Sequence, residues 1–181
     1  MNTIVLTGGT SKRFGSDKSQ AQINGKSLLQ ILTDGLTELI IVGPETSIKA
    51  KYVRESPIGA GPLAAIGAAL KNVESDLVAI FATDMPFAPR VLPELHRALS
   101  NDAALPIDCE GYLQPLAGLY RTAKLSEVLA TFDSLENISI MELIKKLDID
   151  SVEISECQLL IDIDTKAELV NAIDLASRLG L

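Results

Sequence analysis

The sequence predicts a three-layer α/β/α sandwich whose central sheet is mostly parallel. Short β-branched apolar segments alternate with segments of helical period along the whole chain. Glycine or aspartate follows several of the apolar segments, as expected where a buried parallel strand gives way to a loop. No repeat or low-complexity stretch interrupts the alternation. We therefore expect the 181 residues to form a single domain, 1–181.

The predicted elements follow one another in a strand–helix order. Eight apolar segments are predicted as strands: 3–7, 38–43, 51–55, 76–82, 103–107, 115–120, 151–155 and 159–163. The segment 115–120 is expected to lie inside the sheet. Six segments have the period of a helix: 26–36, 62–70, 89–99, 123–132, 139–147 and 165–179. Pro62 suits the first turn of its helix, and Thr165 suits the N-cap of the last one.

Composition limits the classes of function that the chain can have. The formal net charge is −8, which disfavours binding to nucleic acid. Residues 1–26 nevertheless hold four basic side chains against one acidic side chain, a local charge of +3. Such a basic segment on an acidic protein favours a small polyanion, for example a nucleotide. No run of about 18 apolar residues is present and the N-terminus lacks a signal-peptide pattern, so we expect a cytoplasmic protein without a membrane span.

The two cysteines predict neither a metal site nor a disulfide framework. Cys109 and Cys157 are too few and too far apart in the sequence for either. We expect two reduced, buried thiols, as is usual in a cytosolic protein.

The most informative stretch is residues 4–18, IVLTGGTSKRFGSDK. A strand leads into Gly8 and Gly9, and basic residues that include Arg13 and Lys18 follow. Paired glycines allow the backbone to approach a ligand, and backbone N–H groups with fixed positive charge suit a polyphosphate. The spacing matches neither the P-loop nor the dinucleotide-binding glycine motif. The alternative is a simple turn with solvated charges.

Carboxylates follow two of the predicted strands. Asp84 follows 76–82 with only Thr83 between them, where it can ligate Mg²⁺ beside substrate phosphates or cap the turn before Pro86. Asp162 lies in the predicted strand 159–163 and Asp164 directly follows it, so in extended backbone the two share a face. We expect Asp164 to be the second metal ligand because it lies nearer the strand end, with Asp162 the weaker candidate. Asp164 could instead help to cap the last helix.

Other segments offer weaker candidates. Gly61 and Pro62 form a glycine-rich entry to a helix, which can lie near a base, ribose or anion, whereas the small residues after them suit close packing. Gln114 and Arg121 can line an acceptor pocket, or Arg121 can be a solvated residue at a helix start. His96, the single histidine, is expected to face solvent.

Together these residues resemble one family, the molybdenum cofactor guanylyltransferases of the MobA type. LTGGTSKRFGSDK is similar to the family signature L-A-G-G-x-S-x-R-M-G-x-D-K, with Thr7 for alanine and Phe14 for methionine. The strings NGKSLL, GAGPLAAI, TDMPF, QPLAGLYR and IDIDTKAEL resemble the later family blocks in the same order. The resemblance covers essentially the whole chain. It implies a nucleotide-diphospho-sugar transferase-like fold, similar to that of glycosyltransferase-A enzymes.

The resemblance also implies an activity and a site. The expected reaction is transfer of GMP from GTP to the terminal phosphate of molybdopterin cofactor, with release of pyrophosphate. Mg²⁺ is the expected metal, and Mn²⁺ can take its place. The expected catalytic residues are Arg13, Lys18 and Asp84, and the expected metal ligands are Asp84 and Asp164. The expected nucleotide-binding residues are Leu6, Thr7, Gly8, Gly9, Arg13, Lys18, Ser56, Gly61, Pro62 and Asp84. Proteins that insert the cofactor, or the molybdoenzymes themselves, are the implied partners; nucleic acid and membranes are not.

Some residues depart from the family pattern. Ser56 follows Glu55 where relatives often have an aspartate that is thought to touch the nucleotide, and Gly43 replaces an asparagine of some relatives. Gly9 favours guanine, because related cytidylyltransferases more often read L-A-A-G. The alternatives are a nucleotidyltransferase that uses CTP or a sugar-phosphate or phospholactate acceptor, and a nucleotide-sensing adaptor without turnover. The retained Arg13, Lys18 and Asp84 disfavour the adaptor.

Overall fold

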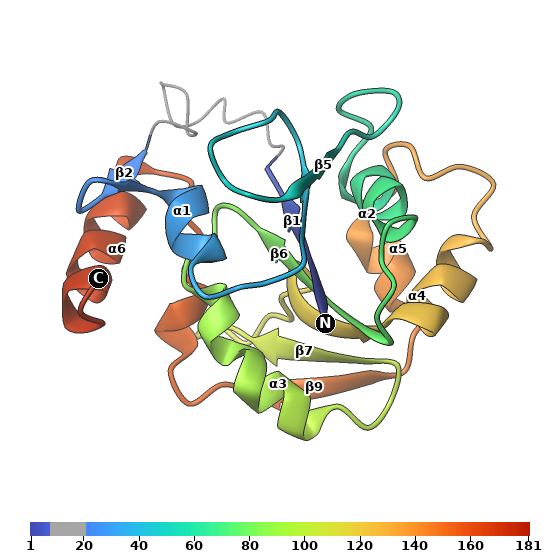
Figure 1. The fold of residues 1–181 in the computed structure, drawn as a ribbon. Coiled ribbons are helices and arrows are strands. Elements are labelled where there is room, and N and C mark those ends of the chain that lie inside the picture. Colours follow the sequence, from blue (N-terminus) through green and yellow to red (C-terminus); the bar gives the residue numbers. More distant parts are fainter. Residues whose placement is uncertain (8–20) are drawn as a thin grey trace.

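The structure is a computed structural model that describes residues 1–7 and 21–181. Within these residues, seven strands form one sheet in the order β5-β4-β1-β6-β8-β7-β9 (Figure 1). They are β1 (Asn2–Leu6), β4 (Leu39–Val42), β5 (Lys51–Val53), β6 (Leu77–Ala82), β7 (Ala103–Ile107), β8 (Ala117–Arg121) and β9 (Ile149–Glu153). A separate hairpin pairs β2 (Gln22–Ile23) with β3 (Lys26–Ser27).

All strands of the sheet run parallel except β8. β8 lies between β6 and β7, as expected for an interior strand, and pairs antiparallel with both. β1 pairs parallel with β4 and β6, β4 with β5, and β7 with β9. The carboxyl ends of β1, β4, β5, β6, β7 and β9 therefore meet at one edge of the sheet, where ligands bind in open α/β folds.

Helices cover both faces of this sheet. They are α1 (Leu28–Thr33), α2 (Pro62–Leu70), α3 (Leu92–Ala98), α4 (Thr122–Leu129), α5 (Ile140–Ile144) and α6 (Lys166–Arg178), with 3₁₀ helices η2 (Ala88–Val91) and η3 (Cys157–Leu160). One hydrophobic cluster joins the sheet to α1, α3 and α6, and a second joins it to α2, α4 and α5 (Figure 1). β1 contributes Val5 to the first cluster and Ile4 and Leu6 to the second. The predicted three-layer sandwich is confirmed.

Local signals in the sequence account for the helix starts. Pro62 is the first residue of α2. Thr165 caps α6 through a capping box, in which its side chain accepts from the N–H of Glu168 and the Glu168 carboxylate accepts from the N–H of Thr165. None of the helices in the described ranges has both the length and the apolar composition needed to cross a bilayer.

The strand predicted over 159–163 is wrong. Its first two residues belong to η3, and the rest form an irregular segment that leads to α6. Leu159 and Leu160 are both buried, and they pack into the core from this 3₁₀ helix and not from a strand. The N–H of Ile163 donates to the carbonyl of Asp84, in a loop, and not to a strand ladder.

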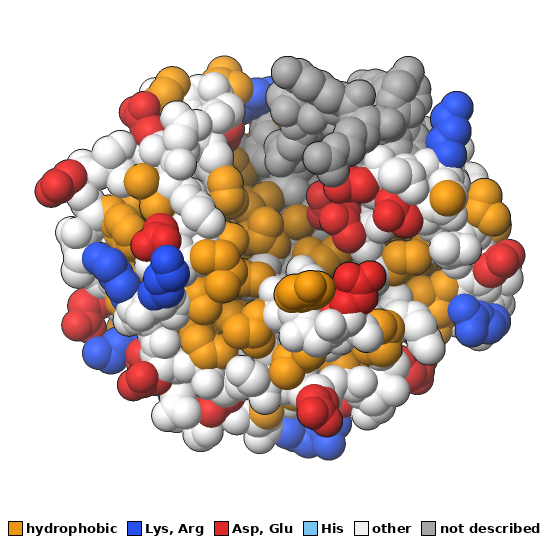
Figure 2. Space-filling view, turned by 180° about the vertical axis from the view of Figure 1, so that it is seen from behind, with side chains coloured by type: hydrophobic (Ala, Val, Ile, Leu, Met, Phe, Trp, Pro, Cys, Tyr) orange, Lys and Arg blue, Asp and Glu red, His pale blue; other side chains and the backbone are white. Residues whose placement is uncertain are grey.

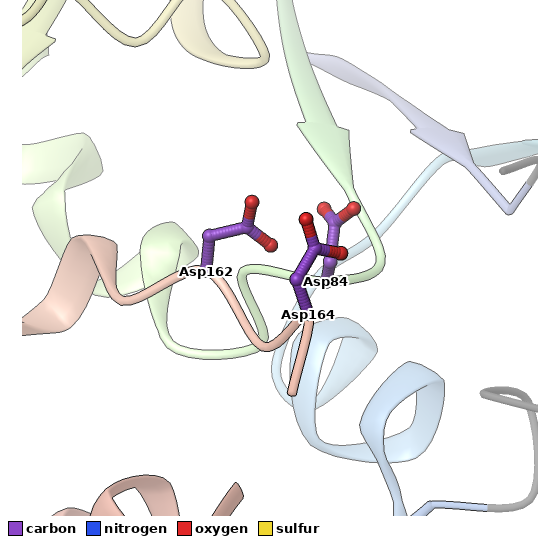
Figure 3. Close-up of side chains that lie close together, drawn as sticks. All are labelled: Asp84, Asp162 and Asp164. Carbon is purple, nitrogen blue, oxygen red and sulfur yellow. The ribbon is translucent and has the colours of Figure 1, made fainter. Parts of the chain in front are cut away.

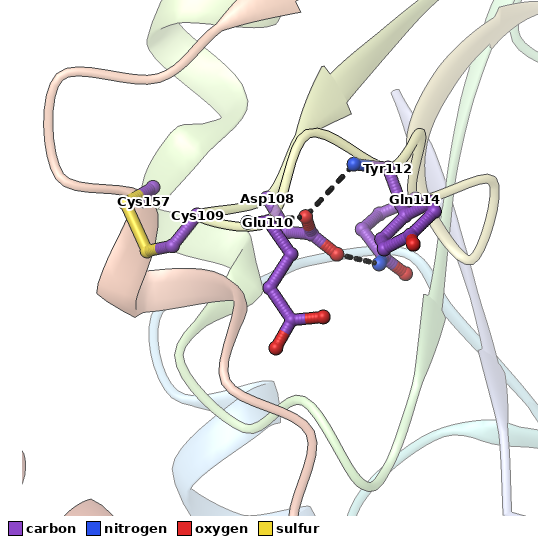
Figure 4. Close-up of a disulfide and its surroundings, with 6 residues drawn as sticks. All are labelled: Asp108, Cys109, Glu110, Tyr112, Gln114 and Cys157. Carbon is purple, nitrogen blue, oxygen red and sulfur yellow. Dashed lines mark hydrogen bonds between the residues drawn. A yellow bond between two sulfur atoms is a disulfide. The ribbon is translucent and has the colours of Figure 1, made fainter.

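The expectation of two reduced, buried thiols is also wrong. Cys109 and Cys157 form a disulfide across 48 residues of sequence (Figure 4). Cys109 is exposed and Cys157 is half-buried. The pairing depends on the parallel neighbours β7 and β9, whose ends bring the two segments together and which sequence spacing does not reveal.

Candidate functional site

The candidate site lies at the edge of the sheet where the parallel strands end. The residues predicted from β1, β6 and the β5–α2 loop all follow carboxyl ends of these strands. The end of β1 and the beginning of the Asp84 loop are directly joined. Both the N–H and the hydroxyl of Thr83 donate to the carbonyl of Leu6, at 3.0 and 2.8 Å. The chain that enters the predicted phosphate loop is thereby held next to Asp84.

Three carboxylates converge at this edge. One oxygen atom each from Asp84, Asp162 and Asp164 lies within 4.8 Å of the others (Figure 3). Asp84 comes from the loop after β6, and the two other aspartates come from the segment between η3 and α6. Asp84 and Asp164 are half-buried, and Asp162 is exposed. Oxygen donors in this number suit Mg²⁺ or Mn²⁺, which prefer carboxylate ligands over nitrogen or sulfur.

Backbone hydrogen bonds explain how segments 78 residues apart in sequence place these groups together. The N–H of Ile163, the residue between Asp162 and Asp164, donates to the Asp84 carbonyl at 3.0 Å. The side chain of Ile163 is buried, so it anchors the segment in the core. On the other side, the Glu168 carboxylate accepts from the N–H groups of Asp164 and Thr165, each at 2.7 Å. The cap of α6 is thus Thr165, and the Asp164 carboxylate faces the cluster.

Asp162 belongs to the cluster as much as Asp164 does, although sequence reasoning ranked it lower. That ranking depended on a strand over 159–163, in which both carboxylates share a face and Asp164 lies nearer the end. The irregular backbone found there turns both carboxylates toward Asp84 (Figure 3). The sequence Asp-Ile-Asp indicates two carboxylates close together, but it does not reveal the irregular backbone that directs both of them toward Asp84.

Both hydrogen-bond donors of Thr7 bond to another part of the protein. Its N–H and its hydroxyl both donate to the carbonyl of Val42, at 3.1 and 2.9 Å. A Cβ atom on Gly43 would overlap the Thr7 hydroxyl oxygen, so any larger residue after β4 would have to displace the Thr7 side chain. Because both donors of Thr7 are bonded to Val42, the backbone contact to the nucleotide that we expect of Thr7 would be made by its carbonyl group. This contact stays a prediction.

The β5–α2 loop holds the remaining described candidates. Ser56 is exposed and precedes a cis peptide bond to Pro57. Gly61 caps α2 with a φ of +95°, which suits glycine. A depression of about 300 Å³ lies beside this loop, lined by Gly43, Pro44, Glu45, Tyr52, Val53 and Arg54.

Several predicted site residues lie outside the described residues. They are Gly8, Gly9, Arg13 and Lys18, whose proposed contacts with phosphate stay predictions.

The two candidates for an acceptor pocket, Gln114 and Arg121, lie at opposite edges of the sheet. Because β8 is antiparallel, Arg121 lies at the opposite edge of the sheet, where it pairs with Leu77. It precedes α4, is exposed, and donates to the carbonyls of Asn101 and Ser100. The interpretation of Arg121 as a solvated residue at a helix start is confirmed, and its place in an acceptor pocket is wrong. Gln114 remains at the site edge, where its amide donates to Asp108.

The surface also offers an apolar area. Figure 2 shows hydrophobic side chains gathered in a hollow at the centre of the face opposite the view of Figure 1, with acidic side chains along one side. His96 is exposed on α3, as predicted.

Comparisons with known proteins agree with this architecture. Residues 3–150 match the model of the MobA-like NTP transferase domain. A protein of Geobacillus sp. (strain WCH70) named "Probable molybdenum cofactor guanylyltransferase" is 33% identical over 147 residues, which cover 71% of this chain and 75% of the relative. A protein of the same name from Bacillus subtilis (strain 168) is 29% identical over 163 residues, covering 83% and 81%.

Solved structures show the same fold. The molybdopterin-guanine dinucleotide biosynthesis protein A of Archaeoglobus fulgidus superposes with a TM-score of 0.78 at 23% identity, covering 98% of this chain and 100% of that one. The 2-C-methyl-D-erythritol 4-phosphate cytidylyltransferase of Thermus thermophilus superposes with a TM-score of 0.69 at 18% identity, covering 98% and 100%. With its sheet, its acidic strand-end cluster and a family match over most of its length, the chain belongs to the MobA-like NTP transferases, a family of nucleotidyltransferase enzymes.

Proposed function

We propose that this protein transfers GMP from GTP to the terminal phosphate of molybdopterin cofactor and releases pyrophosphate. The observation that carries the proposal is the convergence of Asp84, Asp162 and Asp164 at the carboxyl edge of the sheet. The names of relatives about 30% identical in sequence support the choice of guanine and of this acceptor.

The carboxylate cluster supports a divalent metal as cofactor. Its donors are all oxygen atoms, which is the ligand set of Mg²⁺ and Mn²⁺ in proteins. Asp84, Asp164 and Asp162 are the residues that would hold the ion. When bound, the ion neutralises charge on the phosphates of the substrate.

The remaining chemistry needs little from the protein beyond position and charge. An oxygen of the acceptor phosphate attacks the α-phosphorus of GTP, a bond forms between them, and the bond to the bridging oxygen of the β-phosphate breaks. Pyrophosphate leaves with the bonding electrons. The attacking phosphate is ionised near neutral pH, so no strong general base is required. In our proposal Arg13 and Lys18 hold the triphosphate.

Contacts to the base are expected near the ends of β1, β4 and β5. The sequence pattern of the family places an asparagine of some relatives at Gly43 and an aspartate of others at Ser56. Positions 43 and 56 of this chain therefore offer fewer side-chain contacts to a base than those relatives do. The depression of about 300 Å³ that Gly43 helps to line leaves space there for part of a nucleotide. We therefore expect backbone groups, including those of Gly9, to favour guanine.

The deciding experiment measures pyrophosphate release with GTP or CTP, each with purified molybdopterin cofactor and Mg²⁺. We expect release with GTP and molybdopterin together, and much less with CTP. Rates with CTP that equal or exceed those with GTP would overturn the choice of guanine. Release that occurs with a sugar phosphate but not with molybdopterin would overturn the acceptor.

A further inference from the structure

The disulfide joins two loops at the candidate site edge. Cys109 lies two residues after β7, and Cys157 lies four residues after β9. These strands are parallel neighbours in which Ile107 is paired with Glu153, so both loops leave the sheet at the same edge. The second loop continues through η3 directly to Asp162 and Asp164.

The loop that carries Cys109 is held by several hydrogen bonds to Asp108. The Asp108 carboxylate accepts from the N–H groups of Glu110 and Tyr112, each at 2.9 Å, and from the amide of Gln114 (Figure 4). The Asp108 N–H in turn donates to the Tyr112 carbonyl. These bonds hold the loop around Cys109 in addition to the disulfide.

The segment that carries Cys157 leaves β9 after the buried Ile154, and residues 155–157 at its beginning contribute no buried side chain. Leu159, Leu160 and Ile163 are buried and fix its later part. Before Cys157, the N–H and hydroxyl of Ser155 donate to Glu94, at an exposed position. The disulfide is thus the covalent link between the hydrogen-bonded Asp108 loop and the start of the segment that supplies two of the three carboxylates.

We infer that the Cys109–Cys157 disulfide positions Asp162 and Asp164 for metal binding, and that its reduction weakens the metal site. This inference rests on the proposed metal site. Cys109 is exposed, so a dithiol can reach the bond. A dithiol thiolate attacks one sulfur, the S–S bond breaks, and two electrons and two protons pass to the protein. The products are two protein thiols and the cyclic disulfide of the dithiol.

The test compares Mn²⁺ binding by the oxidised and the reduced protein. One sample is prepared without reductant. The other is treated with dithiothreitol and freed of it by gel filtration under nitrogen, and thiols are counted in both. Calorimetry or electron paramagnetic resonance then gives the Kd for Mn²⁺. We expect the Kd to rise about tenfold on reduction, at the low end of the loss seen when groups that orient metal ligands are removed.

A Cys109→Ser/Cys157→Ser variant serves as the matched control. We expect it to bind Mn²⁺ as the reduced protein does, and dithiothreitol to leave its Kd unchanged. A role in stability alone would lower the melting temperature and leave the Kd for Mn²⁺ unaltered.

The outcomes separate this inference from the proposed function. Equal Kd values for the oxidised and reduced protein would overturn the inference and leave the metal site in place. Two free thiols per chain before any reductant is added would also overturn it. Failure of the oxidised protein to bind Mn²⁺ at all would instead contradict the metal site itself.

Discussion

A Cβ atom placed on Gly43 would overlap the hydroxyl oxygen of Thr7, the residue that follows β1. That hydroxyl donates to the carbonyl of Val42, so it cannot turn away without losing a hydrogen bond. The side chain of Thr7 after β1 therefore leaves room for only the smallest residue after β4.

The Thr7–Gly43 relationship predicts a coupled effect on stability. Gly43→Ala should lower the free energy of unfolding by about 1–3 kcal/mol, as is typical of overpacking. The same substitution in a Thr7→Ala background should cost less, because the overlapping hydroxyl is gone. Part of the cost should remain, since Gly43 has a φ of +156°. Urea denaturation of the four proteins measures the coupling, and an equal cost in both backgrounds would contradict it.

Asp84 should matter to turnover more than to stability. In Asp84→Asn, pyrophosphate release should fall on the order of 100-fold, because a charged ligand is lost from the proposed metal site. GTP binding should be largely kept. Asp174→Asn, an exposed carboxylate on α6, is the matched control and should leave turnover unchanged. Unaltered pyrophosphate release by Asp84→Asn would show that the metal assignment is wrong.

Features set by local signals could be predicted from the sequence. Pro62 and Thr165 identify the starts of α2 and α6 because each effect acts within one helical turn. Asp84 could be placed at the site because a buried apolar run ends just before it. The alternation of strands and helices was enough to predict three layers.

Features that depend on topology could not be predicted in this way. Arg121 lies at the far edge because β8 reverses direction, and nothing in its own segment signals that reversal. Asp162 joins the carboxylate cluster because Ile163 bonds to Asp84, 79 residues earlier in the chain. The cysteines pair because β7 and β9 are neighbours. Each case is a contact between distant segments that no local pattern records.

The disulfide should also add to global stability. It closes a loop with a sequence separation of 48, for which restriction of the unfolded chain gives about 2–4 kcal/mol. Urea denaturation with and without dithiothreitol should show a lower midpoint for the reduced protein. The Cys109→Ser/Cys157→Ser variant should unfold at one midpoint in both conditions. Identical curves for the wild type, with both thiols shown to be free, would contradict the prediction.

Asp108 should make stability depend on pH in the acid range. Burial acts to raise the pKa of its carboxyl, but hydrogen bonds from the Tyr112 N–H, the Gln114 amide and the Glu110 N–H together hold that pKa below its usual range. A carboxyl whose pKa is lower in the folded state stabilises the protein above its unfolded pKa of about 4, and this contribution is lost as the pH falls through the folded value.

Asp108→Asn tests this directly. At pH 7 the variant should be less stable than the wild type by about 0.5–1.5 kcal/mol, because the exposed N–H donors keep an acceptor oxygen but lose the negative charge on it. The difference should shrink as the pH falls below the unfolded pKa of about 4 and on through the lower folded pKa of the wild-type carboxyl. Urea denaturation between pH 3 and pH 7, with Asp174→Asn as the exposed control, measures it. A difference that stays constant over this range would mean that the Asp108 charge does not hold the loop.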